Sequence, residues 1–254
     1  MSATRRVGDF CWINMLTTEP EAACAFYAKV LGWTFAAMPM GYTIRVDGQD
    51  IGGLFDVASP GTPAGTLPLI GVMVKVEDAD ATASRIIALG GKARPAFDIM
   101  DAGRMSVCHD PNGAEFDLWQ PKKMHGTEVD RSLHGAPLWF ETITTDVPKA
   151  TAFYDALFGW KAVPMAGPGF VYTRLELAGE GIAGMMPQPI AMQGKTPTWL
   201  VNFNVRDAHE AVRVAVEHGG QVSVPVMDIP HVGLYAGIRS PQGILFYVLE
   251  PRPS

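Results

Sequence analysis

The feature that most constrains this chain is an internal repeat. Trp12, Phe26-Tyr27 and Gly32-Trp33 recur 127 residues later as Trp139, Phe153-Tyr154 and Gly159-Trp160. Asp78 and Gly90-Gly91 recur after 129 residues as Asp207 and Gly219-Gly220, and Pro111 and Phe116 recur after 130 residues as Pro241 and Phe246. A nearly constant offset over so many aromatic and glycine positions indicates two homologous domains.

The length and composition fit this division. A chain of 254 residues is about twice the usual size of one domain, and its 48% of apolar residues are enough for a buried core. We expect a first domain over residues 1–122 and a second over residues 135–254. The segment 123–134 between them is polar and aperiodic, which is typical of a linker.

Each domain contains a fainter repeat of its own. A strand over 10–16 precedes a helix whose apolar residues share one face and which ends at Gly32, and strands over 34–38, 42–46 and 51–55 follow. The order restarts at Leu69, with Asp78 as a helix cap, Ile87 on the inward helix face, and strands over 92–98, 104–108 and 115–119. The second domain repeats both units, with Asp146 and Asp207 as caps. The sequence therefore predicts an α+β fold of four βαβββ modules.

Charge and hydropathy exclude two classes of partner. The net charge of −6 comes without a basic stripe, which argues against nucleic-acid binding. No apolar run approaches the eighteen residues of a membrane span, and the N-terminus has no signal-peptide pattern, so we expect a cytoplasmic protein. The three cysteines have neither an even count nor a metal-binding spacing. We expect a small-molecule ligand as partner, and a monomer or a homodimer.

The motifs resemble those of the vicinal oxygen chelate superfamily, which includes glyoxalase I, extradiol dioxygenases and bleomycin-resistance proteins. The resemblance rests on Phe26-Tyr-x-x-Val-Leu-Gly32-Trp, on Val76-Glu-Asp78-Ala-Asp with the later Gly90-Gly, on Asp110-Pro-Asn-Gly-Ala-Glu-Phe116, and on their second-domain counterparts. It implies that paired modules curl their mixed sheets into a cup. In that family a divalent metal in the cup chelates substrate oxygens, and His, Gln or Glu side chains in the first and last strands of each module hold it.

Those ligand positions carry other residues in this chain. Counting from the helix motifs places them at Trp12, Gly71 and Asp117 in the first domain, and at Trp139, Leu200 and Tyr247 in the second. Indole, glycine and leucine side chains supply no metal ligand, so we expect no metal and no cofactor. A shift of two residues keeps the same strand face and brings in Asn14 and Met73, or Glu141 and Asn202.

The inward faces supply the candidate site residues. Candidate ligand-binding residues are Trp12, Asn14, Trp139, Asn202 and Tyr247, and candidate proton-transfer residues are Glu141, Asp117 and His109. Each has a structural alternative. The tryptophans either line a pocket or fill it as core aromatics. Glu141 either has a raised pKa and transfers protons or is satisfied by a backbone donor, and His109 either works beside Asp117 or bonds the following turn.

Three functions remain open at this point. The first is a glyoxalase-like protein that binds a small hydrophobic, carbonyl or aromatic metabolite in a cup lined by the sheet, as the bleomycin-resistance branch does. The second is a lyase, isomerase or dioxygenase-type enzyme of the same superfamily, with or without a metal. The third is a non-catalytic scaffold whose cups are filled. We expect the second domain to hold any working cup, centred on Trp139, Glu141, Asn202 and Tyr247, because the first offers fewer titratable groups.

Overall fold

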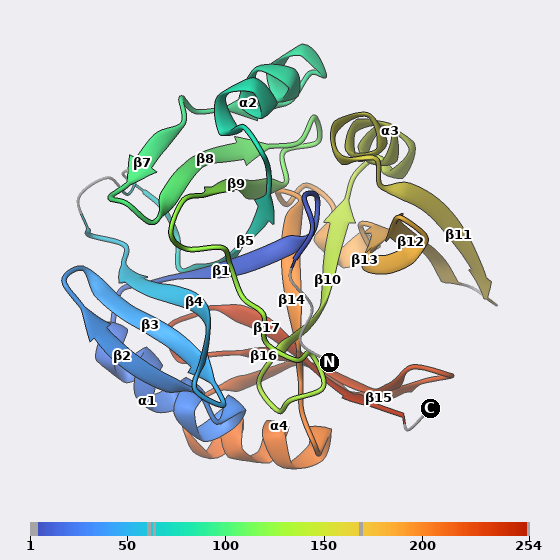
Figure 1. Cartoon of the computed structure of the whole chain (residues 1–254). Helices are drawn as coiled ribbons and strands as arrows, with labels where there is room; N and C mark the ends of the chain where they lie inside the picture. The colour runs from blue at the N-terminus through green and yellow to red at the C-terminus, as the bar shows by residue number, and fades with distance from the viewer. Residues whose placement is uncertain (1–4, 60–61, 63–64, 168–169, 253–254) are drawn as a thin grey trace.

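The chain forms two curled mixed sheets, one for each predicted domain (Figure 1). The computed structural model describes residues 5–59, 62, 65–167 and 170–252. The first domain contains β1 (Phe10–Thr17), α1 (Pro20–Leu31), β2 (Thr34–Met38), β3 (Gly41–Val46), β4 (Gln49–Asp56), β5 (Leu69–Lys75), α2 (Ala79–Ala88), β6 (Lys92–Ala93), β7 (Phe97–Ile99), β8 (Gly103–His109) and β9 (Glu115–Pro121). These elements confirm two βαβββ-type modules in the first domain.

The second domain repeats the order of the first. It contains β10 (Pro137–Thr144), α3 (Val147–Phe158), β11 (Lys161–Gly167), β12 (Phe170–Leu177), β13 (Glu180–Pro187), a short 3-10 helix (Ile190–Met192), β14 (Thr198–Asn204), α4 (Ala208–Glu217), β15 (Gln221–Ile229), β16 (Gly233–Arg239) and β17 (Leu245–Pro251). The strand order is β2-β3-β4-β1-β5-β9-β8-β6 in the first sheet and β11-β12-β13-β10-β14-β17-β16-β15 in the second. The predicted α+β fold with tandem domains is therefore confirmed.

The helices begin largely where the sequence predicts. Asp78, Asp146 and Asp207 each cap a helix by accepting a hydrogen bond from a backbone N–H three residues later. Gly32 ends α1 in the left-handed conformation that glycine adopts at low cost. One predicted inward residue is wrong, because Ile87 is 59% exposed on the outer face of α2.

One predicted strand is divided in the structure. The segment 92–98 forms β6 and β7 instead of a single strand, and both pair with β8. Pro95 lies between them and has no N–H to donate to the ladder. In the second domain Pro225 is accommodated within the edge strand β15, whose register against β16 shifts between Val224 and Met227.

Modules within one domain meet at their first strands. β1 pairs with β5 in the antiparallel sense and with β4 in the parallel sense, and β10 pairs with β14 and β13 in the same way. The first strand of each domain therefore runs through the middle of its sheet. Because side chains alternate along a strand, every second residue of β1 and β10 faces the concave side, while the others face the helices.

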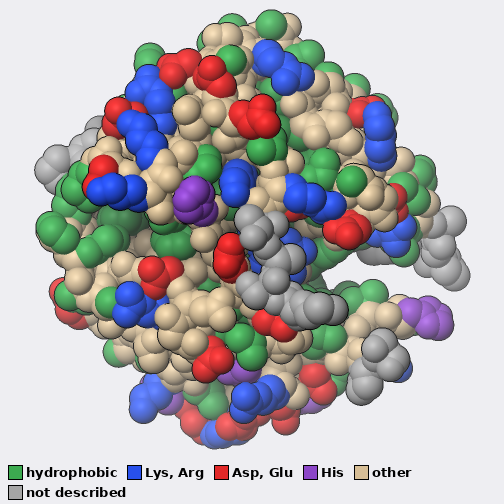
Figure 2. All heavy atoms as spheres, viewed as in Figure 1, with side chains coloured by type: hydrophobic (Ala, Val, Ile, Leu, Met, Phe, Trp, Pro, Cys, Tyr) green, Lys and Arg blue, Asp and Glu red, His purple; other side chains and the backbone are tan. Residues whose placement is uncertain are grey.

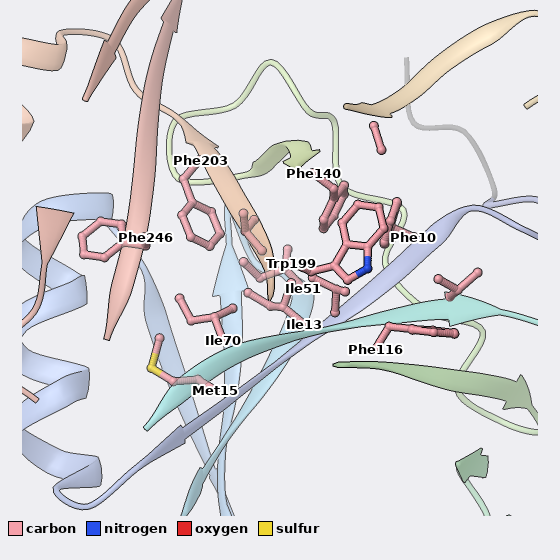
Figure 3. Close-up of a cluster of buried hydrophobic side chains, with 14 of the residues drawn as sticks. Phe10, Ile13, Met15, Ile51, Ile70, Phe116, Phe140, Trp199, Phe203 and Phe246 are labelled. Atoms are coloured by element: carbon pink, nitrogen blue, oxygen red, sulfur yellow. The ribbon is translucent and has the colours of Figure 1, made fainter. Parts of the chain in front are cut away.

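The two domains share one hydrophobic core. Phe10 stacks on Phe140 with ring centroids 4.1 Å apart, and both lie in the buried cluster of Figure 3. Phe26 of α1 contacts Phe246 of the other domain at a ring distance of 6.2 Å. In the symmetric place, Phe116 of β9 contacts the α3 ring of Phe153 at 6.3 Å. Each domain thus buries its first helix partly against the last strand of the other.

Two reciprocal hydrogen bonds fix this arrangement. Trp33 Nε1 donates to the carbonyl oxygen of Gly135 at 2.8 Å, and Trp160 Nε1 donates to that of Gly8 at 2.9 Å. Both glycines have positive φ, +83° at Gly135 and +88° at Gly8. The indoles are buried, so these bonds are shielded from water. The repeat seen in the sequence therefore extends to the contacts between the domains.

No helix in the described residues is both long enough and apolar enough to cross a membrane.

Candidate functional site

The cup of the first domain is filled by its own side chains. Trp12 is only 9% exposed and packs in a buried cluster with Cys11, Met73 and Trp119. The half-buried residues Ile99, Ala102, Met105 and Met124 cover this cluster. Trp119 Nε1 also donates to the carbonyl oxygen of Met124 at 2.8 Å, so the linker closes over the cup. Trp12 is thus packed as a core aromatic in the structure, and a ligand-binding role for it stays a prediction.

A small polar group remains at one end of this cup. Asn14 Nδ2 lies 3.4 Å from Asp117 Oδ2 and 3.4 Å from the sulfur of Met73. Asp117 is 8% exposed, and burial raises its pKa to about 8, with a further contribution from the nearby charge of Glu115. The Asp117 carboxyl is therefore largely neutral at pH 7.

His109 lies on the same sheet face but does not contact Asp117. It is directly opposite Glu115 in the β8–β9 ladder, and its Nε2 is 3.2 Å from Glu115 Oε2. Val107 is the residue opposite Asp117. His109 is thus half-buried and in contact with Glu115 at the end of the strand, and a role for it in proton transfer stays a prediction.

The cup of the second domain is open and polar at its floor. Figure 2 shows a cleft between the lobe that carries β11 to β13 and the hairpin of β15 and β16. Trp139 is half-buried here, in contrast with Trp12. Glu141 is 7% exposed and accepts hydrogen bonds from Tyr172 Oη at 2.8 Å and from Asn202 Nδ2 at 3.0 Å. Trp139 Nε1 donates to Tyr172 Oη at 2.7 Å, which links the indole to the carboxyl group.

Strand register explains why these residues converge. Trp139 lies opposite Asn202, and Asn202 lies beside Tyr247 on the next strand. Counting along the sequence makes Leu200 the counterpart of Trp139, but in the pairing of β10 with β14 Leu200 lies opposite Glu141. The first domain shows the same difference, with Met73 rather than Gly71 opposite Trp12. Each first strand also has a register shift near its start, between Phe10 and Trp12 in β1 and between Pro137 and Trp139 in β10.

Two tyrosines of the site were missed by the sequence reasoning. Tyr172 comes from β12, and Tyr235 comes from β16, where its hydroxyl lies 3.5 Å from Glu141 Oε2 and its ring stacks on Tyr247 at 5.1 Å. Gly184 makes room for Tyr172, because a Cβ at Gly184 would lie 1.7 Å from the tyrosine hydroxyl. A glycine within a strand is the sequence signal that pointed to this close approach.

Burial dominates the electrostatics of this floor. Desolvation raises the pKa of Glu141, although hydrogen bonds from Asn202, Tyr172 and Tyr235 favour its charged form. Burial and the neighbouring Glu141 carboxylate also raise the pKa values of Tyr172, Tyr235 and Tyr247. The phenols therefore stay protonated, and those of Tyr172 and Tyr235 donate hydrogen bonds to the Glu141 carboxyl group.

The donors in this cup do not fit a divalent metal ion. Such an ion needs at least three converging N, O or S ligands, and no cluster of three His, Cys, Asp or Glu side chains occurs in the part of the chain that the structure describes. Trp139 supplies no lone pair, and both oxygens of Glu141 already accept hydrogen bonds. The expectation of no metal stays a prediction, which metal analysis can test.

Comparisons with known proteins identify the family of this chain. Residues 12–119 match the family described as a glyoxalase-like domain, and residues 137–248 match the Glyoxalase/Bleomycin resistance protein/Dioxygenase superfamily. The protein CFP32 of Mycobacterium tuberculosis, named as a candidate glyoxylase, is 34% identical over 256 residues, which cover 98% of this chain and 97% of CFP32. The anthracycline biosynthesis protein DnrV of Streptomyces peucetius is 30% identical over 262 residues, 96% of this chain and 94% of DnrV.

Solved structures show the same fold at low identity. The Mn(II)-bound glyoxalase of Novosphingobium aromaticivorans superposes with a TM-score of 0.66 at 15% identity, covering 96% of this chain and 82% of the glyoxalase. The 2,3-dioxygenase LapB of Pseudomonas sp. KL28 has a TM-score of 0.66 at 14% identity, with 99% and 96% covered. This chain therefore belongs to the glyoxalase/bleomycin resistance/dioxygenase superfamily, as a member with two glyoxalase domains in tandem.

Proposed function

We propose that the cup of the second domain binds a small, flat aromatic metabolite that carries hydroxyl or carbonyl oxygens. One observation carries the proposal: the buried Glu141 carboxyl of the second domain lies in a network of tyrosine and asparagine side chains. A mostly apolar pocket with a few convergent polar groups is the usual form of a small-molecule site.

The apolar wall suits a planar ligand. Tyr235 and Tyr247 stack with an interplanar angle of 21°, and Ile143, Leu200 and Met186 belong to the same apolar cluster. Trp139 comes from β10 as well, donates a hydrogen bond to Tyr172 and is only half-buried. Aromatic side chains contribute about 0.5–1.5 kcal/mol per ring pair beyond the burial of area. An aromatic ligand would extend this stack.

The polar groups select oxygen substituents. Asn202 is 1% exposed, and no described residue donates a hydrogen bond to its Oδ1. A buried acceptor without a partner costs about 1–3 kcal/mol, so a ligand hydroxyl that donates to Asn202 would recover this loss. The Glu141 carboxyl, whose pKa burial raises, would bind an adjacent ligand oxygen.

The names of two relatives support the aromatic class. DauV and DnrV of Streptomyces are both named anthracycline biosynthesis proteins, and each aligns with 96% of this chain. Anthracyclines are polycyclic aromatic compounds with hydroxyl and carbonyl groups, which is the chemistry that the cup would recognise.

A proton-transfer enzyme is the second candidate function. The raised pKa of Glu141 favours it, because a carboxyl group transfers protons best when its pKa lies near the working pH. Glu141 would then protonate or deprotonate a bound carbonyl or phenol, as in a metal-independent lyase or isomerase. Tyr172 and Asn202 would orient the carboxyl group for this step.

Ligand binding to the Glu141→Gln variant tests the proposal. Catechols, dihydroxyanthraquinones and aromatic amides are screened by thermal shift, and the best binder is titrated by calorimetry. Glutamine keeps the shape of the side chain and removes its ionisable proton, so the dissociation constant should rise at least tenfold, about 1.4 kcal/mol. If the best binder is also converted by the wild type but not by the variant, the protein is an enzyme.

Asp117→Asn is the matched control in the other cup. It removes a buried carboxyl group of the first domain, and binding of the aromatic probe should stay within twofold of wild type. If Glu141→Gln binds normally while Asp117→Asn or His109→Ala abolishes binding, the first domain is the working one and the proposal fails.

A further inference from the structure

A cavity of about 200 Å³ lies where the two domains meet. Its walls come from the first residues of β5 and β9 in one sheet and from β14, β16 and β17 in the other. Its lining includes Gly71, Glu115 and Asp117 from the first domain, and Thr198, Leu200 and Arg239 from the second. A water molecule occupies about 30 Å³ in the liquid, so the cavity holds the equivalent of roughly six waters. An organic molecule of a few heavy atoms fits this volume.

The cavity forms because paired strands diverge at one level of both sheets. The β5–β9 ladder begins at the pair Met73–Asp117, and the β14–β17 ladder begins at Asn202–Tyr247. Before these pairs, β5 is not paired with β9, and β14 is not paired with β17. The gap between the strands of one sheet lies next to the gap in the other, where β5 contacts β14. Gly71 lies beside the Asp117 carboxyl group, since a Cβ at Gly71 would be in van der Waals contact with Asp117 Oδ2 at 3.9 Å.

Asp117 supplies a buried polar group on the cavity wall. Its only hydrogen bond from a described side chain is the 3.4 Å contact with Asn14, which is long for a bond of this type. Because the carboxyl group is largely neutral at pH 7, it offers both an O–H donor and an acceptor. A molecule in the cavity can therefore bond to this group.

Arg239 supplies a cation on the opposite wall. Its Nη1 donates to the carbonyl oxygen of Gly243 at 2.8 Å, and no described carboxylate forms an ion pair with it. Glu115, the other acidic residue of the cavity lining besides Asp117, contacts His109 at 3.2 Å. Arg239 thus retains N–H donors that can bind a carboxylate.

We propose that this interdomain cavity binds a small carboxylic acid that bears a second oxygen, as a hydroxyl or keto group. The carboxylate pairs with Arg239, the second oxygen bonds to Asp117, and the short carbon chain lies against Leu69 and Leu200. Each domain supplies one of the two polar partners, so the site exists only in the assembled chain. It requires no part of the Glu141 network.

Methyl NMR with lactate as probe tests the proposal. Lactate should shift the methyl signals of Leu69 and Ile70, which line the cavity, and leave Met186 in the second cup unchanged. Propionate lacks the hydroxyl group and lactamide lacks the charge, so each should bind at least tenfold more weakly. Arg239→Gln and Asp117→Leu should each raise the lactate dissociation constant at least tenfold.

Two further variants keep the outcome decisive. Gly71→Ala adds one methyl group to the cavity and should weaken lactate binding tenfold even if Asp117→Leu fails to fold. Glu141→Gln should bind lactate as wild type does, which separates this site from the aromatic one. The proposal is overturned if 50 mM lactate shifts no cavity methyl group, if the shifts centre on Met186, or if Arg239→Gln binds as wild type does.

Discussion

Replacing Asp117 by asparagine should change how the stability of the protein depends on pH. Burial raises the pKa of Asp117 from the ordinary value of 3.8 to about 8 in the folded chain. Between these two values the folded state keeps a proton that the unfolded state releases. The contribution of Asp117 to the free energy of unfolding should therefore be most favourable below about pH 4, and should fall as the pH rises toward about 8.

The magnitude follows from the size of the shift. Each pH unit between the unfolded and folded pKa values changes the free energy of unfolding by about 1.4 kcal/mol per group. Between pH 5 and pH 7.5 wild type should lose about 3 kcal/mol from Asp117 alone. Asparagine has nearly the same shape, does not ionise, and can still accept from Asn14. The variant should gain this amount relative to wild type over the same range.

Urea unfolding of both proteins at pH 5, 6.25 and 7.5 measures the difference. Other titrating groups, Glu141 included, are common to both proteins and cancel in the comparison. Asp101→Asn removes a surface carboxylate that pairs with Lys123 and controls for the loss of charge alone. If the free energies of wild type and Asp117→Asn change in parallel with pH, Asp117 is ionised in the folded state and the reasoning is wrong.

Three other predictions concern the domain contact, the cup and the metal. Gly135→Ala should lower the free energy of unfolding in urea by about 3–5 kcal/mol, because a Cβ there would lie 2.2 Å from the Leu31 carbonyl oxygen and disturb a buried hydrogen bond. Gly8→Ala, at a similar φ but with more space, should lower it by about 1–2 kcal/mol. Gly184→Ala should displace Tyr172 and weaken aromatic binding about tenfold, with Tyr172→Phe giving a similar loss. Dialysis against a chelator should leave the Tm unchanged and metal analysis should find no stoichiometric ion, since the cup donors do not fit one.

The repeat made most of the fold predictable. Caps, helix ends and alternating strands are local signals, so the aspartates at 78, 146 and 207 and the glycine at 32 are found where they were expected. Pro95 is a local signal of the break between β6 and β7, although a single strand over 92–98 was predicted. Local chemistry thus accounts for the order of the modules.

Contacts between strands that are distant in the sequence were harder to predict. Glu141 and Asn202 were predicted to share a face, and the structure places them in a hydrogen bond. Tyr172 and Tyr235 come from strands whose register depends on the curl of the sheet, which no short motif specifies. The filling of the first cup depends on the linker residue Met124, whose position depends on how the two domains pack.

The two cups differ through a few exchanges at equivalent positions. Where the first domain has Met73 and Asn14, the second has Asn202 and Glu141. Trp119 of the first domain occupies the strand position that Leu249 holds in the second. The large indole ring fills the first cup, whereas the smaller leucine side chain does not fill the second. Burying a carboxyl group costs several kcal/mol.

The shared core explains how the second domain tolerates the free-energy cost of burying a carboxyl group. Trp12, Met73 and Trp119 bury nearly all of their surface in the first cup, at about 1.5–3 kcal/mol for each large apolar side chain. Because Phe10 stacks on Phe140 and the two indoles bond across the interface, this stability is common to both domains. A filled first cup therefore stabilises the chain in which the second cup keeps Glu141 buried.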